Sequence, residues 1–234
     1  MKLELREVTR RQGANFELKV DLTATGNVIG ILGQSGSGKT TLLEIVAGLR
    51  RADAGAVVLD GTVLMDRAAG IFLPPERRGV GYVPQDLALF PHLSVRGNIE
   101  YGSVRGGKSG PSLEQVGRVL EIDLLLDHRV AQLSGGQKQR VAFARALRAQ
   151  PRLLLMDEPL SSLDEELKGR IIPYLRRMRE EFGIPMIYVS HSGDELAALC
   201  DEVLVLRGGE CVGAGKPGEI FEPVRAMRTK ADWL

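Results

Sequence analysis

A glycine-rich loop lies between an apolar run and a helix-forming segment near the start of the chain. The apolar run is Val28 to Leu32, the loop reads Gly-Gln-Ser-Gly-Ser-Gly-Lys-Thr from Gly33 to Thr40, and the helix-forming segment is Thr41 to Val46. A strand that leads through such a loop into a helix directs several backbone N–H groups and the positive end of the helix dipole toward one point. This order of elements is typical of an α/β protein, and it predicts a phosphate-binding site at the loop.

The residue types in the loop suit a nucleoside triphosphate. Three glycines let the main chain approach a phosphate without Cβ clashes. Lys39 is predicted to reach the β- and γ-phosphates of ATP or GTP, and the Thr40 hydroxyl to ligate Mg²⁺. The alternative is a glycine-rich turn that binds nothing. The predicted nucleotide-binding residues are Gly33, Gln34, Ser35, Gly36, Ser37, Gly38, Lys39, Thr40 and Thr41.

Composition excludes several other classes of protein. A chain of 234 residues with 44% apolar residues can bury a sizeable core, and a net charge of +1 gives no electrostatic reason to expect a nucleic-acid partner. No apolar run approaches the ~20 residues that span a bilayer, so we expect a cytoplasmic chain whose membrane role depends on partners. Cys200 and Cys211 lack metal-type spacing and are assigned no chemistry.

The hydrophobic pattern predicts two kinds of strand. Leu3 to Val8 and Phe16 to Leu22 alternate apolar with polar residues, which indicates two half-buried antiparallel strands. Short continuous apolar runs indicate strands buried on both faces, as in a parallel sheet covered by helices. These runs are Val57 to Leu59, Val80 to Val83, Leu153 to Met156, Met186 to Val189 and Val203 to Leu206.

Strand patterns disappear between residues 86 and 150. Helices are predicted over Leu113 to Leu120 and Lys138 to Leu147, and a loop over Gly106 to Pro111. We therefore expect a helical subdomain at residues 86–150, inserted into a core formed by residues 1–85 and 151–234.

A pair of carboxylates ends the apolar run Leu153 to Met156. Asp157 is predicted to hold Mg²⁺ through its water shell, and Glu158 to polarise the water that attacks the γ-phosphate. Such a pair after an apolar run is often only a turn. The strand ends also matter here, because ligands of parallel sheets bind beyond the carboxyl ends of the strands. The phosphate loop, Asp157 and His191 all fall at such ends.

Besides the phosphate loop, a second helix N-terminus suited to binding an anion is predicted at Leu133 to Gln137, which reads Leu-Ser-Gly-Gly-Gln. Ser134 is a favoured N-cap residue, and Gly135 and Gly136 leave helix-start N–H groups open to an anion. A capped helix that binds nothing is the alternative. This segment has no catalytic carboxylate of its own.

Six short motifs in this order closely resemble those of the ATPase subunits of ABC transporters, and the resemblance covers nearly the whole chain. They are Gly33 to Thr40 as Walker A, Gln85 as the Q-loop residue, Leu133 to Gln137 as the signature, Leu153 to Glu158 as Walker B, Ser161 to Asp164 as the D-loop, and His191 as the switch histidine. Taken alone, Gln85 and His191 would read as a loop glutamine and a core histidine. The resemblance implies a P-loop NTPase of ABC type, with a mostly parallel sheet, an antiparallel β-layer and a helical subdomain.

The resemblance also implies a mechanism. Two copies pair head to tail, so that the Walker A loop of one faces Ser134, Gly135, Gly136 and Gln137 of the other and two ATP molecules lie between them. Gln85 contacts Mg²⁺ or the water, His191 hydrogen-bonds the γ-phosphate, and Asp164 links the two sites. The implied Mg²⁺ ligands are Thr40, Gln85 and Asp157. Family members place an aromatic residue against adenine near the first turn, where this chain offers only Arg11 or Phe16.

A finer resemblance favours an importer. Leu89 to Ile99 and Ile184 to Glu195 are similar to ATPase subunits of molybdate importers. This similarity implies polytopic membrane permease subunits, a periplasmic or extracellular substrate-binding protein, and a peripheral place on the inner face of the membrane. The apolar run Leu87 to Pro91 is the expected docking surface for the permease. Importers of this group commonly carry a C-terminal regulatory β-domain, which is absent here or truncated after Trp233-Leu234.

Other functions stay open at this point. Importers of sulfate, tungstate, polyamines or sugars share these motifs. Soluble ABC proteins of DNA repair carry a long coiled coil between the Q-loop and the signature, and those of translation carry two cassettes; this chain has neither feature. A P-loop kinase lacks the Leu-Ser-Gly-Gly-Gln segment and the switch histidine.

Overall fold

A computed structural model describes residues 1–103 and 111–221, and the chain divides into two compact units. Unit 1 comprises Met1–Arg78 and the chain from Met186 onward, and unit 2 comprises Gly79–Pro185. These boundaries differ from the predicted ones at residues 85 and 150. The predicted division separates an ATP-binding core from a helical subdomain by function, and it stays a prediction.

Unit 1 is built on a mixed β-sheet. Its strands are β1 (Lys2–Gln12), β2 (Phe16–Thr25), β3 (Val28–Leu32), β4 (Ala54–Leu59), β5 (Thr62–Asp66), β6 (Ile71–Phe72), β9 (Met186–Ser190), β10 (Glu202–Arg207) and β11 (Glu210–Gly215). They lie in the order β6-β5-β4-β1-β2-β11-β10-β3-β9. Its helices are α1 (Lys39–Ala47), the short 3₁₀ helix η1 (Pro75–Arg77) and α6 (Gly193–Leu199).

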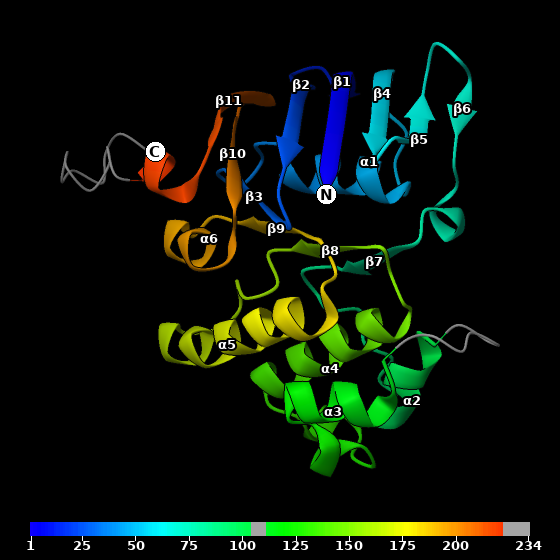
Figure 1. Cartoon of the computed structure of the whole chain (residues 1–234), viewed down its shortest axis with the longest axis vertical. Coiled ribbons are helices and arrows are strands. Elements are labelled where there is room, and N and C mark those ends of the chain that lie inside the picture. The colour runs from blue at the N-terminus through cyan, green and yellow to red at the C-terminus, as the bar shows by residue number, and fades with distance from the viewer. Residues whose placement is uncertain (104–110, 222–234) are drawn as a thin grey trace. The chain divides into compact units, whose positions relative to one another are not determined.

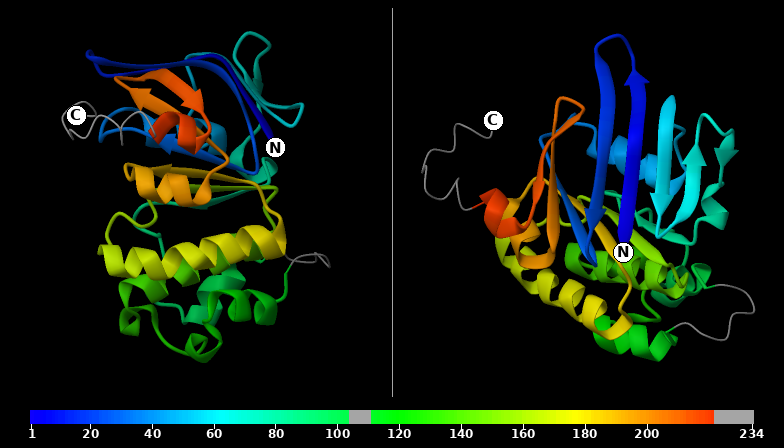
Figure 2. Two further views of the ribbon diagram at one scale, coloured as in Figure 1. Left: turned by 60° about the vertical axis from the view of Figure 1, so that its left-hand side comes forward. Right: turned by 45° about the horizontal axis from the view of Figure 1, so that its top comes forward.

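The antiparallel layer predicted from the N-terminal alternation is confirmed. β1 and β2 pair antiparallel, and Leu3, Leu5, Leu18 and Val20 are buried. The two strands are the long blue arrows of Figure 1 and of the right-hand view in Figure 2. Alternating residues of these stretches thus face the core, and an irregularity in β1 between Leu5 and Val8 keeps Val8 buried as well.

The prediction of a parallel strand at Val57 to Leu59 was wrong. This run lies in β4, which pairs antiparallel with β1 on one side and with β5 on the other. A continuous apolar run indicates burial on both faces, and Val57, Val58 and Leu59 are indeed buried. Burial alone does not fix the direction of a strand, so the run carried no information about its pairing.

The parallel part of unit 1 is as predicted. β3 pairs parallel with β9 and with β10, so the runs Met186 to Val189 and Val203 to Leu206 lie in parallel strands. Helix α6 packs against β3 and β9.

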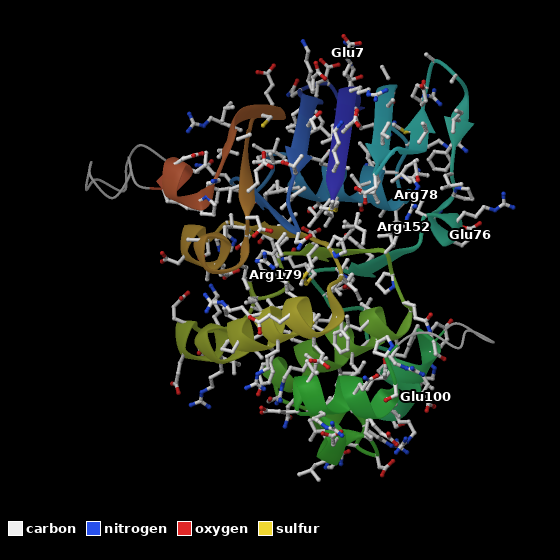
Figure 3. The ribbon with its side chains drawn as sticks, viewed as in Figure 1. Glu7, Glu76, Arg78, Glu100, Arg152 and Arg179 are labelled. Carbon is white, nitrogen blue, oxygen red and sulfur yellow. The ribbon has the colours of Figure 1, made fainter. Side chains whose placement is uncertain are left out.

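Helix α1 is fixed at both ends. Gly38 precedes it with φ of 101°, a left-handed conformation that glycine adopts without strain. At its carboxyl end the buried Arg78 donates from Nη1 to the carbonyl oxygens of Ile45 and Val46, at 2.7 and 2.8 Å. The Ile45 carbonyl oxygen also accepts from the N–H of Gly48, which ends the helix, and the guanidinium adds a second donor at this helix end. Burial lowers the pKa of Arg78 to about 10, which leaves it charged at neutral pH. Arg78 is labelled in Figure 3.

Unit 2 combines a pair of parallel strands with helices. The strands are β7 (Val80–Val83) and β8 (Leu153–Asp157), which pair parallel as predicted. The helices are α2 (Val95–Tyr101), α3 (Leu113–Leu120), α4 (Gly135–Arg148) and α5 (Glu165–Phe182), with 3₁₀ helices η2 (Asp123–Leu125) and η3 (Val130–Gln132). The other three α-helices all contact α4, which also packs on β7 (Figure 1).

The predicted helix over Leu113 to Leu120 is confirmed with the same bounds, and the helix expected at Lys138 to Leu147 lies within α4. Residues 106–110 of the predicted loop and the C-terminal Trp233-Leu234 lie outside the described residues. Within the two described ranges no helix is long and apolar enough to cross a membrane.

Candidate nucleotide-binding site

The phosphate loop and His191 leave the sheet of unit 1 at the same edge. β3 ends at Leu32 and β9 at Ser190, and these two residues pair in the parallel register. The residues that follow, Gly33 and His191, therefore emerge next to each other beyond the carboxyl ends of neighbouring strands. This is the edge at which α/β proteins bind ligands.

The loop from Gly33 to Gly38 folds around the amine of Lys39. The side chain is 4% exposed, and Nζ donates to the carbonyl oxygens of Gly33 and Gln34 at 2.7 and 2.8 Å. The loop thus places a buried positive charge at its centre. A phosphate oxygen is a stronger acceptor for this ammonium than a neutral carbonyl.

Two other loop residues are suited to an anion. Gly36 has φ of 80°, and a Cβ built on it meets no atom within 4 Å, so the main chain is open there. The Ser37 hydroxyl is buried without a hydrogen-bond partner. By contrast, a Cβ on Gly33 would lie 2.4 Å from the Ser37 hydroxyl and 2.5 Å from the Leu206 carbonyl oxygen. Gly33 is therefore required by the packing of the loop itself.

The β1–β2 turn contacts the start of α1. Gln12 donates its amide to the Thr41 hydroxyl at 3.1 Å, so Thr41 is held by the turn, whereas Thr40 is exposed. A Cβ on Gly38 would lie 3.0 Å from the ring of Phe16. Arg11 is 77% exposed and pairs with Glu17. Of the two predicted base-contacting residues, Phe16 is the one that lies against the loop.

A buried carboxylate organises the segment around His191. Glu195 is 4% exposed and accepts hydrogen bonds from the Tyr188 and Ser190 hydroxyls at 2.8 and 2.9 Å. The Ser192 N–H donates to the Ser190 hydroxyl, and Ser192 caps α6. Both neighbours of the exposed His191 are thus fixed, and the imidazole lies on a short, well-defined turn.

Unit 2 repeats the arrangement at the ends of β7 and β8. Val83 pairs with Met156 in parallel register, so Gln85 and the carboxylates of Asp157 and Glu158 follow neighbouring strand ends. Asp157 is 4% exposed, and the Tyr82 hydroxyl donates to its Oδ2 at 3.5 Å. The carboxylate is thus held in place from the neighbouring strand.

Ser161 connects Gln85 to Glu158. Its hydroxyl donates to the carbonyl oxygen of Glu158 at 2.9 Å and accepts the amide of Gln85 at 3.3 Å. Glu158 has φ of 43°, a left-handed conformation that costs a side-chain-bearing residue free energy and that often marks functional sites. β8 ends at Asp157, and Glu158 is the first residue of the turn that follows the strand.

The signature segment begins α4 as predicted. The Ser134 hydroxyl accepts from the N–H of Gln137 at 3.3 Å, and the Gln137 amide oxygen accepts from the N–H of Ser134 at 2.8 Å. Gly135 is exposed, whereas Gly136 packs against Leu167 of α5. At the start of α5, the predicted D-loop residue Asp164 is an N-cap that accepts from the N–H of Leu167.

The sequence did not predict three residues that hold the candidate site residues in place. Gln12, Tyr82 and Glu195 each hold a predicted site residue or its neighbour by a side-chain hydrogen bond. Tyr82 gave a signal, because a polar hydroxyl stood in an apolar strand that leads to Gln85. Gln12 and Glu195 carried no such signal in the sequence, because their hydrogen-bond partners depend on tertiary packing. The functional roles of the predicted site residues stay predictions.

These features define the chain's class. Residues 17–161 match the family model for "ABC transporter", which is more than half of the chain. The chain therefore belongs to the ABC transporter family, and the predicted family resemblance and fold class are confirmed.

Close relatives share one name. The chain is 50% identical over 217 residues to the molybdenum import ATP-binding protein ModC of Rhizobium etli. It is 50% identical over 211 residues to ModC 1 of Azotobacter vinelandii and 47% identical over 218 residues to ModC of Pseudomonas aeruginosa. These alignments cover 92%, 89% and 92% of this chain, but only 61%, 58% and 60% of the relatives. The chain thus spans about three fifths of their length.

Solved structures support the fold. A dimeric bacterial ABC transporter cassette is 28% identical with a TM-score of 0.75, over 92% of this chain and 98% of that one. The same cassette has also been solved as a dimer in a post-hydrolysis state bound to ADP and Pi. CbiO1 of Clostridium perfringens, part of the ABC transporter complex CbiONQ, is 27% identical with a TM-score of 0.80, over 97% of this chain and 92% of that one.

Proposed function

We propose that this chain is the ATP-hydrolysing subunit of an ABC importer, and that it powers the uptake of an oxyanion, molybdate. The sequence identity of 47–50% to ModC proteins is the observation that supports an importer and molybdate as its solute. The family match and the phosphate loop carry the ATP-dependent step. The solute itself touches no residue of the chain in this proposal, so sequence identity is its only support.

The loop residues fit a triphosphate. The buried Lys39 amine, the buried Ser37 hydroxyl and the open main chain at Gly36 supply a cation, a donor and space in one loop. A bound phosphate would replace the two carbonyl oxygens that the Lys39 amine contacts. The backbone N–H groups at the start of α1 would add the positive end of the helix dipole.

Mg²⁺ would be held by Thr40 and, through water, by Asp157 and Gln85, together with phosphate oxygens. This mixed ligand set is the usual one for Mg²⁺, which retains water and takes few protein ligands. When bound, the ion would neutralise charge on the phosphates. The burial of Asp157 and its hydrogen bond from Tyr82 support a fixed carboxylate in this role.

Hydrolysis needs a group that orients and polarises the attacking water. We assign this role to Glu158, because it is the first residue after β8 and Ser161 fixes its carbonyl oxygen. His191 would donate a hydrogen bond to the γ-phosphate from the turn that Glu195 holds. Both roles follow the family motif.

The base would stack on Phe16. Its ring lies beside Gly38 at the start of α1, whereas the guanidinium of Arg11 is engaged with Glu17. An offset aromatic contact is favourable for a purine ring.

A second copy would complete the site with the signature segment. The N-terminal end of α4, with Ser134, Gly135, Gly136 and Gln137, would face the γ-phosphate bound by the other chain. The dimeric cassette among the solved relatives supports pairing of two copies, and the head-to-tail arrangement follows the family resemblance. Asp164, at the N-cap of α5, would lie between the two nucleotides.

The permease would dock at Leu87 to Pro91. Phe90 stacks against Tyr101, which is 69% exposed, with ring centroids 4.4 Å apart. An aromatic pair of which Tyr101 is exposed and Phe90 partly buried, beside an apolar run, suits the apolar face of a helix from a membrane partner. A substrate-binding protein would act on the far side of that permease.

One experiment tests the whole proposal. The chain is co-expressed with the permease subunits, purified as a complex and reconstituted in vesicles of bacterial phospholipid that enclose ATP, with the substrate-binding protein added outside. We expect ATP-dependent uptake of radioactive molybdate, and none by vesicles that carry Lys39→Ala. Uptake of sulfate alone would overturn the solute. Absence of ATP hydrolysis, or a chain that co-purifies with ribosomes or DNA instead, would overturn the function.

A further inference from the structure

The segment that follows Gln85 has an unusual backbone. Leu87 and Ala88 have φ values of 63° and 43°, and both are left-handed although both carry a Cβ. Two consecutive residues in this conformation are costly unless the surroundings hold them. The Leu87 N–H closes the turn by donating to the Pro84 carbonyl oxygen at 2.9 Å, so Gln85 lies inside the same turn.

A side chain from a distant part of the chain holds the two carbonyl groups of this turn. Arg145, on helix α4, donates from Nη2 to the Leu87 carbonyl oxygen at 2.7 Å and from Nη1 to the Ala88 carbonyl oxygen at 2.5 Å. The carbonyl groups of these two left-handed residues thus bind the same guanidinium. The planar fork of arginine suits this pair of acceptors, and a single ammonium does not.

The contact is also partly desolvated. The guanidinium lies 5.5 Å from the centre of the Phe90 ring. Burial lowers the pKa of Arg145, and the carboxylate of Asp86 acts in the opposite direction. A charge-assisted hydrogen bond with reduced access to water is stronger than an exposed one.

A second side chain fixes the other end of the segment. The buried Asn98 of α2 accepts from the N–H of Phe90 at 2.8 Å and donates to the Phe90 carbonyl oxygen at 3.0 Å. Phe90 is therefore anchored independently of Arg145. Between Gln85 and Phe90, Arg145 holds the two carbonyl groups of the turn, while the Asp86 carboxylate accepts from the Ala88 N–H at 3.2 Å.

We infer that Arg145 is a positioning residue for Gln85: it locks the left-handed turn at Leu87 and Ala88 and thereby sets where the Gln85 amide lies during hydrolysis. This rests on the proposed function. Arg145 belongs to α4, the helix whose N-cap is Ser134 of the signature segment. The turn that contains Gln85 is therefore hydrogen-bonded to this helix. The amide of Gln85 then reaches Ser161, and through it Glu158, from a fixed position.

The first test compares two arginines of the same helix. Arg145→Lys keeps the charge but cannot bond both carbonyl groups in the same way. We expect it to lower kcat for ATP hydrolysis by about tenfold or more, with the KM for ATP changed less than about twofold. Arg148→Lys is the matched control, because Arg148 also donates to a backbone carbonyl oxygen, that of Pro111. It should leave kcat unchanged. A wild-type kcat in Arg145→Lys overturns the inference.

Two further variants address the turn itself. Ala88 is exposed, so glycine there removes no packing and abolishes the cost of the left-handed backbone. Adding Ala88→Gly to Arg145→Lys should restore most of kcat. Ala88→Val leaves Arg145 intact but disfavours the left-handed conformation, and it should reproduce the loss. If Arg145→Lys fails to fold, unchanged kcat in Ala88→Val still overturns the inference.

A double-mutant cycle tests whether Arg145 acts through Gln85. In a Gln85→Ala background, Arg145→Lys should lower kcat by less than about twofold, because the positioned group is already gone. Full additivity of the two losses would show that Arg145 acts elsewhere and would overturn the inference.

Amide hydrogen exchange separates this inference from the proposed function, because it needs no ATP. Arg145→Lys should raise the exchange rate of the Leu87 amide at least about tenfold, and Ala88→Gly should partly reverse the change. Unchanged exchange overturns the inference and leaves the proposed function standing. A wild-type chain without ATPase activity, together with the expected exchange pattern, would overturn the proposed function alone.

Discussion

Leu32 and Ser190 pair across the neighbouring parallel strands β3 and β9. This pairing places the first residue of the phosphate loop and the switch histidine side by side, although the two are far apart in the sequence. Val83 and Met156 do the same for Gln85 and the acidic pair in unit 2. Each unit therefore carries its own half of the predicted site at the carboxyl ends of two parallel strands.

Lys39→Ala should weaken ATP binding by about tenfold or more and abolish turnover. The amine is the buried cation of the loop, and a phosphate oxygen is a stronger acceptor than the Gly33 and Gln34 carbonyl oxygens to which it donates. Nucleotide affinity, hydrolysis and thermal melting are measured together, with the exposed Lys19→Ala as control. The chain should stay folded, since two hydrogen bonds to carbonyl groups contribute about 1 kcal/mol each. Unchanged affinity with unchanged hydrolysis would refute the role of Lys39.

Ser134→Arg should block dimerisation driven by ATP. A bulky cation at the start of α4 would occupy the space of the γ-phosphate contact, but it also removes a capping box. Ser112→Arg is a matched control, because Ser112 and Gln115 form the same capping box at the start of α3. Both variants should lose about 1 kcal/mol of stability, and only Ser134→Arg should fail to dimerise in light scattering.

A mixing experiment extends this test. Chains with Lys39→Ala and chains with Ser134→Arg should each be inactive, whereas a mixed dimer contains one composite site free of both changes. Recovery of ATP-driven dimerisation in the mixture is the expected result. If Ser134→Arg alone dimerises like the wild type, the signature segment does not close on the nucleotide.

Arg78→Ala should lower the free energy of unfolding by about 3 kcal/mol, because it removes a buried guanidinium that donates to three backbone carbonyl groups. The partners are the carbonyl oxygens of Leu73, Ile45 and Val46. Arg77→Ala, at the exposed neighbouring position, should change stability by less than about 0.5 kcal/mol. Urea unfolding curves of the three proteins decide the matter, and equal losses would mean that the contacts of Arg78 do not hold α1.

Stability should depend on pH through Glu121. The Tyr174 hydroxyl, and then Arg177, lower the pKa of this carboxyl below its ordinary 4.5. The ionised form is therefore favoured in the folded state, and its contribution is present above pH 4.5 and lost as the pH falls through the lowered pKa. Because Glu121 is half exposed, Tyr174→Phe should reduce this contribution by less than about 1 kcal/mol. Unfolding curves between pH 7 and pH 3 should show the difference between the two proteins shrinking toward low pH.

Local signals explain what could be predicted from the sequence. The alternation in β1 and β2, the helix from Leu113 to Leu120 and the cap at Ser134 depend on residues within a few positions of one another. The parallel strands that end at Leu32 and Asp157 were also predictable, because apolar runs led directly into the motifs. The position of the candidate site could therefore be predicted from short-range patterns, together with the rule that ligands bind beyond the carboxyl ends of parallel strands.

Features that depend on distant partners could not be predicted. The direction of β4 is decided by pairing with β1 and β5, and its apolar run reads the same in either direction. The left-handed backbone at Leu87, Ala88 and Glu158 has no local cause such as glycine. At Leu87 and Ala88 it is held in part by Arg145, which is far along the chain, and at Glu158 by Ser161, whose hydrogen bond the sequence pattern does not reveal.

The most direct test of the account is ATP binding and hydrolysis by Glu158→Gln. The amide keeps the size of the side chain but cannot polarise water as a carboxylate does. The account predicts that this variant binds ATP with wild-type affinity, loses hydrolysis by about a hundredfold or more, and accumulates as a dimer in light scattering with ATP. Glu100→Gln, on the exposed face of α2, should behave like the wild type in all three measurements. Wild-type turnover by Glu158→Gln would contradict the central claim.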